Sequence, residues 1–151
     1  MTFVDKIVEF NMIAGTGGRF DTRKVALYIG LQLEEMAEKI SSIPHGGELG
    51  KLQTSLEYHS KLFKEGRFDF LVENINQVEA LDADVDLAVV ALGGGIALGA
   101  DISGACHEVM DSNLSKSVLD EDGNRVMLKD ENGKVMKPDT FWKPELRKYL
   151  R

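Results

Sequence analysis

The stretch that decides the fold is Val25-Ala-Leu-Tyr-Ile-Gly-Leu-Gln-Leu-Glu-Glu-Met-Ala-Glu38. Its apolar residues recur at spacings of three and four, which predicts an amphipathic helix. Asp21 or Thr22 can cap the start of this helix, because both side chains carry an oxygen that accepts from a backbone amide. We expect the helix to run to about Ser42, before Pro44.

This helix is expected to have two faces of different character, given a rotation of about 100° per residue. The face that we expect in the core carries Val25, Ile29, Met36, Ile40 and Ile43. The other face aligns Leu27 and Leu31 with Glu34 and Glu38, and Glu35 lies at its edge. Unpaired charge on such a semi-apolar surface is costly, so these acids call for a positive partner.

A second acidic stretch, Glu79-Ala-Leu-Asp82 and on to Asp86, lies in a helix that we expect over about 69–99. Asp86 precedes Leu-Ala-Val-Val-Ala-Leu, so we expect little of that turn to face water. Exposed acids in an acidic protein are the plain alternative, because Glu is a good helix former. Two acidic clusters in apolar stripes favour a site for Mg²⁺ or Mn²⁺, and no Cys/His set suits zinc.

Three further helices are expected around these two. One covers residues 3–13 and is broken by Gly15-Thr16-Gly17-Gly18. Another ends at Gly66, and the apolar stripe that predicts it consists of Leu49, Leu52, Leu56, Leu62 and Phe63. The last begins after a cap at Asp101.

The helical period stops after Ser112. Two turn dipeptides follow, Asp122-Gly123 and Asn132-Gly133, and they predict a small hairpin. We therefore expect a single all-α domain over 1–151, a bundle of about five helices with a C-terminal β-hairpin and tail over 113–151. Helices with two apolar faces need partners, so we expect a homodimer or a dimer of dimers.

The composition narrows the class of partner. The chain has 151 residues and a net charge of −7, with +2 from residue 113 onward and −9 before it. This balance argues against a duplex nucleic acid partner. No apolar run is long enough for a bilayer, so no membrane partner is expected. Cys106 is the single cysteine and cannot form an internal disulfide, which favours the cytoplasm of a cell, or of an infected cell.

The pattern Glu34-Glu35-x-x-Glu38, followed by an acidic pair on a later helix, resembles the MazG-like all-α nucleoside triphosphate pyrophosphohydrolases. That group includes the dimeric dUTPases and phosphoribosyl-ATP pyrophosphohydrolase. The second motif of the family is Glu-x-x-Asp, which Glu79-Ala-Leu-Asp82 fits literally, whereas another register ends at Asp86 and uses Asp82 as its first acid. Both registers stay open. The metal ligands that we favour from the resemblance are Glu34, Glu35, Glu38, Asp82 and Asp86.

The tail is similar to that of a phage- and bacteria-encoded branch of the family. The matching residues are Ser112-Asn-Leu-Ser-Lys116 after the last helix and the Lys137-Pro138 hairpin, which in that branch closes over the nucleotide. The resemblance implies that Asn113, Lys116 and Lys137 contact the phosphates. It also implies that Asn11, near the end of the first helix, reads the edge of the base.

The resemblance implies hydrolysis between the α- and β-phosphates, which yields a nucleoside monophosphate and pyrophosphate. Mg²⁺ or Mn²⁺, two or more ions per site, would assist the reaction, and Glu35 or Glu38 would take a proton from the attacking water. The implied role is control of nucleotide pools. A metal–nucleotide binding protein without turnover is the competing hypothesis.

The base preference depends on Gly93-Gly94-Gly95, three glycines inside a helical pattern. They either widen a base pocket or let two helices approach closely. The first interpretation favours a purine dNTP such as dGTP as the substrate. The alternative substrate is dUTP.

Overall fold

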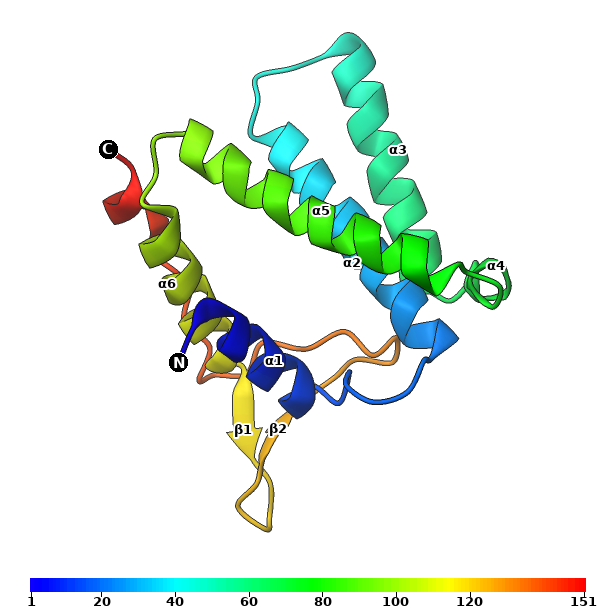
Figure 1. Cartoon of the computed structure of the whole chain (residues 1–151), viewed down its shortest axis with the longest axis vertical. Helices are drawn as coiled ribbons and strands as arrows, with labels where there is room; N and C mark the ends of the chain where they lie inside the picture. The colour runs from blue at the N-terminus through cyan, green and yellow to red at the C-terminus, as the bar shows by residue number, and fades with distance from the viewer. The chain divides into compact units, whose positions relative to one another are not determined.

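A computed structural model describes residues 1–151 and contains six α-helices, a two-stranded antiparallel sheet and one 3-10 helix (Figure 1). The predicted all-α character and the small C-terminal hairpin are confirmed. The chain forms two compact units. Unit 1 comprises residues 1–17, 76–130 and 135–151, and unit 2 comprises residues 18–75 and 131–134. None of the helices combines the length and the apolar character needed to cross a membrane.

Unit 2 is built on a pair of long helices that pack side by side. Its helices are α2 (Thr22–Ser41), α3 (Gly47–Lys64) and the short α4 (Asp69–Val72). Asp21 caps α2 as predicted, because its carboxylate accepts from the amide of Lys24 at 3.0 Å. The hydroxyl of Ser60 on α3 donates to the carbonyl of Gly30 on α2 at 2.7 Å, and this buried bond marks a close approach of the two helices.

The buried face of α2 differs from the predicted one. Met36 and Ile43, expected in the core, are 44 % and 49 % exposed. The buried residues are Ala26, Leu27, Gly30, Ala37 and Ile40. Small side chains on this face let the backbones of α2 and α3 come close, so packing density rather than side-chain hydrophobicity selects it. The stripe predicted for α3 is also only partly right, since Leu49 and Leu52 are exposed.

The single helix predicted over 69–99 is wrong, because the chain breaks between α4 and α5 (Gln77–Ala97). Asn76 causes the second start: its side-chain oxygen accepts from the amides of Val78 and Glu79. An asparagine in this position satisfies amides that have no partner inside the helix. Residues 69–76 therefore lie outside α5, the helix that carries the second set of acids.

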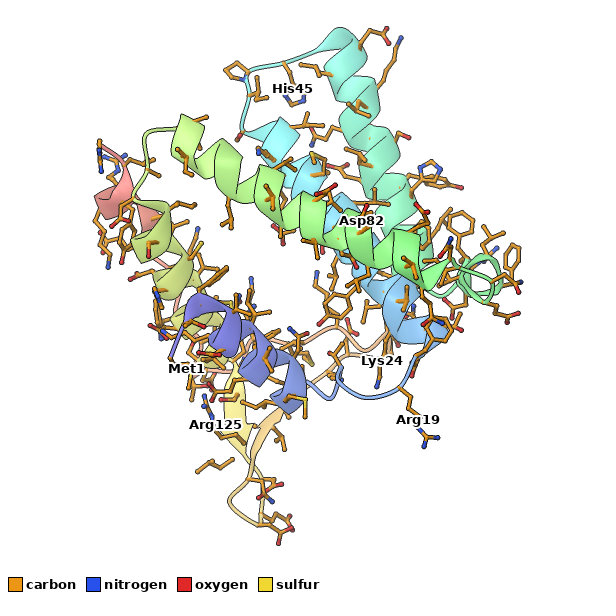
Figure 2. All side chains as sticks on the ribbon, in the orientation of Figure 1. Met1, Arg19, Lys24, His45, Asp82 and Arg125 are labelled. Carbon is orange, nitrogen blue, oxygen red and sulfur yellow. The ribbon has the colours of Figure 1, made fainter.

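Unit 1 combines three helices with the hairpin. Its elements are α1 (Phe3–Ile13), α5, α6 (Ile102–Leu114), β1 (Ser117–Leu119), β2 (Arg125–Met127) and the 3-10 helix η1 (Leu146–Tyr149). The predicted first helix and the cap of α6 by Asp101 are confirmed. Arg125, at the hairpin (Figure 2), donates to Glu9 of α1 at 3.0 Å and to the carbonyl of Leu114 at 3.2 Å. One arginine thereby joins the hairpin to α1 and α6.

Both predicted turns are confirmed. Gly123 and Gly133 have φ values of +81° and +84°, a conformation that glycine adopts without the strain of a side chain. The first turn joins β1 to β2, with Val118 opposite Val126. After the second turn the chain returns antiparallel to itself, with Lys129 opposite Val135.

Candidate functional site

Glu34 is the first residue of the first acidic motif, and its carboxylate binds two lysines. The ammonium of Lys64 on α3 lies 2.9 Å from Oε1. The ammonium of Lys134, in the 131–134 turn, lies 3.0 Å from both carboxylate oxygens. Partial burial opposes ionisation of Glu34, but the hydrogen bonds and charges of the two lysines outweigh it, so the pKa of Glu34 is lowered. Glu34 is therefore a charged, lysine-bound carboxylate.

A cavity of about 280 Å³ lies beside this cluster, between α2 and α3. Its lining is mostly polar and consists of Glu34, Ala37, Glu38, Ser41, Gln53, Glu57, Ser60 and Lys64. Glu34 and Glu38 are one helical turn apart, which brings these two of the three carboxylates of the motif to the same cavity. Glu35 is exposed and is not part of the lining.

The donor set of this cavity fits a hard divalent cation in its chemistry. The carboxylates of Glu34, Glu38 and Glu57 and the side-chain carbonyl of Gln53 all offer oxygen ligands. Mg²⁺ and Mn²⁺ prefer oxygen ligands in proteins. No three acidic, histidine or cysteine side chains are arranged as a metal centre, however, and the carboxylate of Glu34 is bound by lysines. A cation that binds Glu34 would therefore compete with the ammonium groups of Lys64 and Lys134 for this carboxylate.

The acids of the second motif lie on α5, in unit 1. Asp82 is in the first half of the helix (Figure 2), and Asp86 follows one turn later. Every residue from 81 to 90 is exposed, so the expected shielding of the turn after Asp86 is absent. Glu79, in the first turn of α5, is exposed as well. Because all three acids are exposed, burial does not decide whether the motif is Glu79 with Asp82 or Asp82 with Asp86.

The basic candidates of the tail come together in unit 1. The ammonium of Lys116 donates to the side-chain oxygen of Asn113 at 2.7 Å. The ammonium groups of Lys116 and Lys137 lie 5.5 Å and 5.1 Å from the centre of the Phe141 ring. Three candidates separated by up to 24 positions in the sequence thus gather around one aromatic side chain. This gathering creates a positive patch at the end of α6.

The serines of the Ser112-Asn-Leu-Ser-Lys116 segment hold the tail. Ser112, 2 % exposed, donates to the carbonyl of Trp142 at 2.7 Å. The hydroxyl of Ser115 accepts from the amide of Trp142 at 3.3 Å, and its carbonyl accepts from Thr140 at 3.0 Å. These bonds position Phe141 beside the two lysines.

The remaining candidates have local partners. Asn11 donates to the carbonyl of Ile7 within α1 at 2.9 Å. A Cβ on Gly95 would lie 2.4 Å from Cδ1 of Ile102, so this glycine allows close packing of α5 against the start of α6. A Cβ on Gly93 would have no heavy atom within 4 Å. Close packing of two helices of the same chain therefore accounts for Gly95 but not for Gly93.

The sequence interpretation missed the residues that α3 and the second turn bring to Glu34. Gln53, Glu57, Ser60 and Lys64 line the cavity together. They recur at spacings of four, three and four, which is a polar stripe on one face of α3 and a signal that the sequence contained. Lys134 had no such signal, because it follows Glu34 by 100 positions.

Comparison with protein-family models, with curated proteins and with solved structures gave no match for this chain.

Proposed function

We propose that this protein is a metal-dependent nucleoside triphosphate pyrophosphohydrolase that acts on the α–β phosphate bond of a (d)NTP. The observation that carries the proposal is the cavity between α2 and α3, which Glu34 and Glu38 line together with Lys64, the partner of Glu34. Carboxylates beside lysines suit a ligand that is itself a cation bound to phosphates. The sequence resemblance to the MazG-like enzymes, on both acidic motifs and the tail, supports the same reaction.

The proposed roles follow from the chemistry of each side chain. The proposed ligands of Mg²⁺ or Mn²⁺ are Glu34, Glu35 and Glu38 on α2, and the second sequence motif adds Asp82 and Asp86 on α5 as proposed ligands. When bound, the metal neutralises the triphosphate and activates water at neutral pH. Glu38, or Glu35 at the edge of the motif, accepts the proton of the attacking water. These assignments place the hydrolytic chemistry on α2.

The basic patch of unit 1 would bind the phosphates. Lys116 and Lys137 offer mobile ammonium groups, which bind phosphate oxygens as point charges. Asn113, bonded to Lys116 at 2.7 Å, would fix the direction of that ammonium. Phe141, whose ring centre lies 5.5 Å and 5.1 Å from the two ammonium groups, offers an aromatic surface against which a base can pack.

A panel of dNTPs incubated with Mg²⁺ tests the proposal. We expect pyrophosphate and the nucleoside monophosphate as the products, because cleavage at the α-phosphorus releases the outer two phosphates together. Orthophosphate and a diphosphate would assign the protein to a different reaction. Binding of dNTP and Mg²⁺ without any product would favour the competing hypothesis of a binding protein. EDTA provides the control for metal dependence.

The same panel tests the base preference. We propose a purine dNTP such as dGTP as the preferred substrate and dUTP as the alternative. A pocket that satisfies the hydrogen-bonding groups of one base can discriminate by roughly 10²–10⁵ in kcat/KM. Higher kcat/KM for dUTP than for dGTP would contradict the purine assignment and leave the reaction itself unaffected.

A further inference from the structure

The two lysines on Glu34 are held by a common anchor. Arg23 of α2 donates to the carbonyl of Phe63 at 3.0 Å and to the carbonyl of Lys64. The same guanidinium donates to the carbonyl of Asn132 at 3.1 Å. One arginine therefore fixes the backbone on which Lys64 stands and the turn that carries Lys134.

The turn itself fits closely against α2. Gly133 has a φ of +84°, and a Cβ there would lie 3.7 Å from the side chain of Leu27. This contact and the hydrogen bond from Arg23 to Asn132 hold the turn so that Lys134 reaches the carboxylate of Glu34. The side chain of Lys64 is 21 % exposed and that of Lys134 is 43 % exposed, so both ammonium groups remain accessible to a soluble ligand.

A cation bound at Glu34 would reverse the electrostatics of this cluster. The carboxylate now attracts two ammonium groups, whereas a divalent cation in their place would repel them. The lysines then need a new anionic partner within reach of the same cavity. A polyphosphate bound to the cation supplies such a partner, because its oxygens lie next to the cation.

We propose that Lys64 and Lys134 are polyphosphate-binding residues. Their ion pairs with Glu34 hold them in place until a metal-bound polyphosphate binds and becomes their new partner. The inference rests on the proposed function, whose site it extends to α3 and the 131–134 turn. No covalent step is involved: Glu34 would bind the cation, and Lys64 and Lys134 would donate their hydrogen bonds to phosphate oxygens instead.

Calorimetric titration with Mg²⁺ and inorganic tripolyphosphate tests this proposal without a base or a reaction. Lys64→Met and Lys134→Met keep most of the side-chain length and remove the charge. We expect each to raise the Kd of tripolyphosphate about tenfold or more, as expected for loss of a charge-assisted hydrogen bond. Lys134→Arg should restore most of the affinity. Lys61→Met is the matched control, since Lys61 is on α3, is 71 % exposed and pairs only with Glu65 in a surface contact.

Turnover of the preferred dNTP provides the second readout. Loss of a phosphate contact should raise KM while kcat changes little, whereas general damage to the fold would lower kcat and the melting temperature together. If the wild-type protein is active and both Lys64→Met and Lys134→Met leave Kd and KM unchanged, the inference is overturned and the proposed function stands. Lysine-dependent tripolyphosphate binding by a protein that releases no pyrophosphate would keep the inference and overturn the function. A wild-type protein that binds no tripolyphosphate would overturn the inference.

Discussion

Glu34 and Glu38 lie one turn apart on α2 and have different surroundings. Glu34 is bound by two lysines, which lower its pKa and keep it ionised. Glu38 is exposed and lines the cavity from the next turn. A carboxylate held by ammonium groups suits metal binding after exchange, and a more open carboxylate suits proton transfer. The two residues should therefore respond differently to substitution.

Replacing Glu38 with glutamine should lower kcat by about 10²-fold or more, because general-base catalysis contributes that much in many enzymes. The fold should persist, since the substitution keeps the side-chain volume. Steady-state pyrophosphate release measures the effect, and a thermal melt checks the fold. Glu65→Gln is the control, because Glu65 pairs with Lys61 on the surface of α3. Wild-type turnover by Glu38→Gln would rule out its catalytic role.

Glu108 gives a prediction on pH. Its carboxylate accepts from Lys148 at 2.8 Å, from the amide of Glu145 at 3.0 Å and from the hydroxyl of Tyr149 at 3.2 Å. The Lys148 hydrogen bond is the main reason that the pKa of Glu108 is lowered from its ordinary value of 4.5. Contacts that need the carboxylate are present above pH 4.5 and weaken as the pH falls through the lowered pKa.

Hydrogen exchange of the C-terminal segment can follow this titration. We expect the amide of Asp101, which donates to the carbonyl of Tyr149 at 2.8 Å, to lose protection as the pH falls below about 4.5. Glu108→Gln should lose part of that protection already at pH 7. Equal protection in the two proteins at pH 7 would show that Glu108 does not hold the tail.

At the scale of elements, the α2–α3 pair depends on the absence of a side chain at Gly30. A Cβ there would lie 2.9 Å from the carbonyl oxygen of Ser60 and 2.8 Å from Cγ of Lys64. Gly30→Ala should therefore push the helices apart and destabilise the protein by about 1–3 kcal/mol, despite the higher helix propensity of alanine. Urea denaturation measures the change.

Gly50→Ala is the matched control for this prediction. Gly50 is also in a helix of unit 2, and the nearest atom to its Cβ would be 4.0 Å away. With no clash, the gain in helix propensity should stabilise the protein by up to about 1 kcal/mol. A stable Gly30→Ala variant would mean that the two helices can separate without loss of packing.

Features that depend on neighbouring residues could be predicted from the sequence. The bounds of α1, the caps of α2 and α6 and both glycine turns follow from local hydrogen bonding and local φ values. The break before α5 depends on a single competing cap, Asn76, within an otherwise helical pattern. The buried face of α2 depends on the shape of α3, which periodicity alone does not contain.

In the candidate site too, residues that are close in the sequence could be predicted, and residues that only the fold brings together could not. Glu34 and Glu38 could be found because one helical turn separates them, and Asn113 and Lys116 because they belong to one short motif. Lys134 could not, since only the folded chain brings it to Glu34 across 100 positions. The sequence therefore predicted Glu34 and Glu38 and missed the two lysines that bind Glu34.

At the scale of the whole molecule, α5 is the long helix whose apolar side chains are left exposed to solvent. It contains no buried residue, although it is 21 residues long and largely apolar. Val78, Leu81, Val85 and Val89 recur at spacings of three and four and are all more than half exposed. An unpaired apolar surface of this kind favours association. We expect a second copy of the chain to cover it, as a dimer or a dimer of dimers.

Light scattering after size exclusion can test this assembly. The wild-type protein should run as a dimer or tetramer, and the double substitution Val85→Lys and Val89→Lys should give monomers, because it buries two charges in the expected interface. Val8→Lys is the control, since Val8 has the same 56 % exposure as Val85 but lies on α1. A monomeric wild-type protein would contradict the prediction.

The 131–134 turn also has a consequence for how the chain folds. Both partners in the Glu34–Lys64 pair are made early, and closing that contact spans 30 positions, whereas the Glu34–Lys134 contact spans 100. Loop closure becomes costlier and slower as the span increases. During synthesis α2 and α3 can therefore pair while Lys134 has yet to be translated. The last lysine to reach Glu34 comes from a segment that a shortened translation product would lack, so an incomplete chain would hold Glu34 with Lys64 as its one lysine partner.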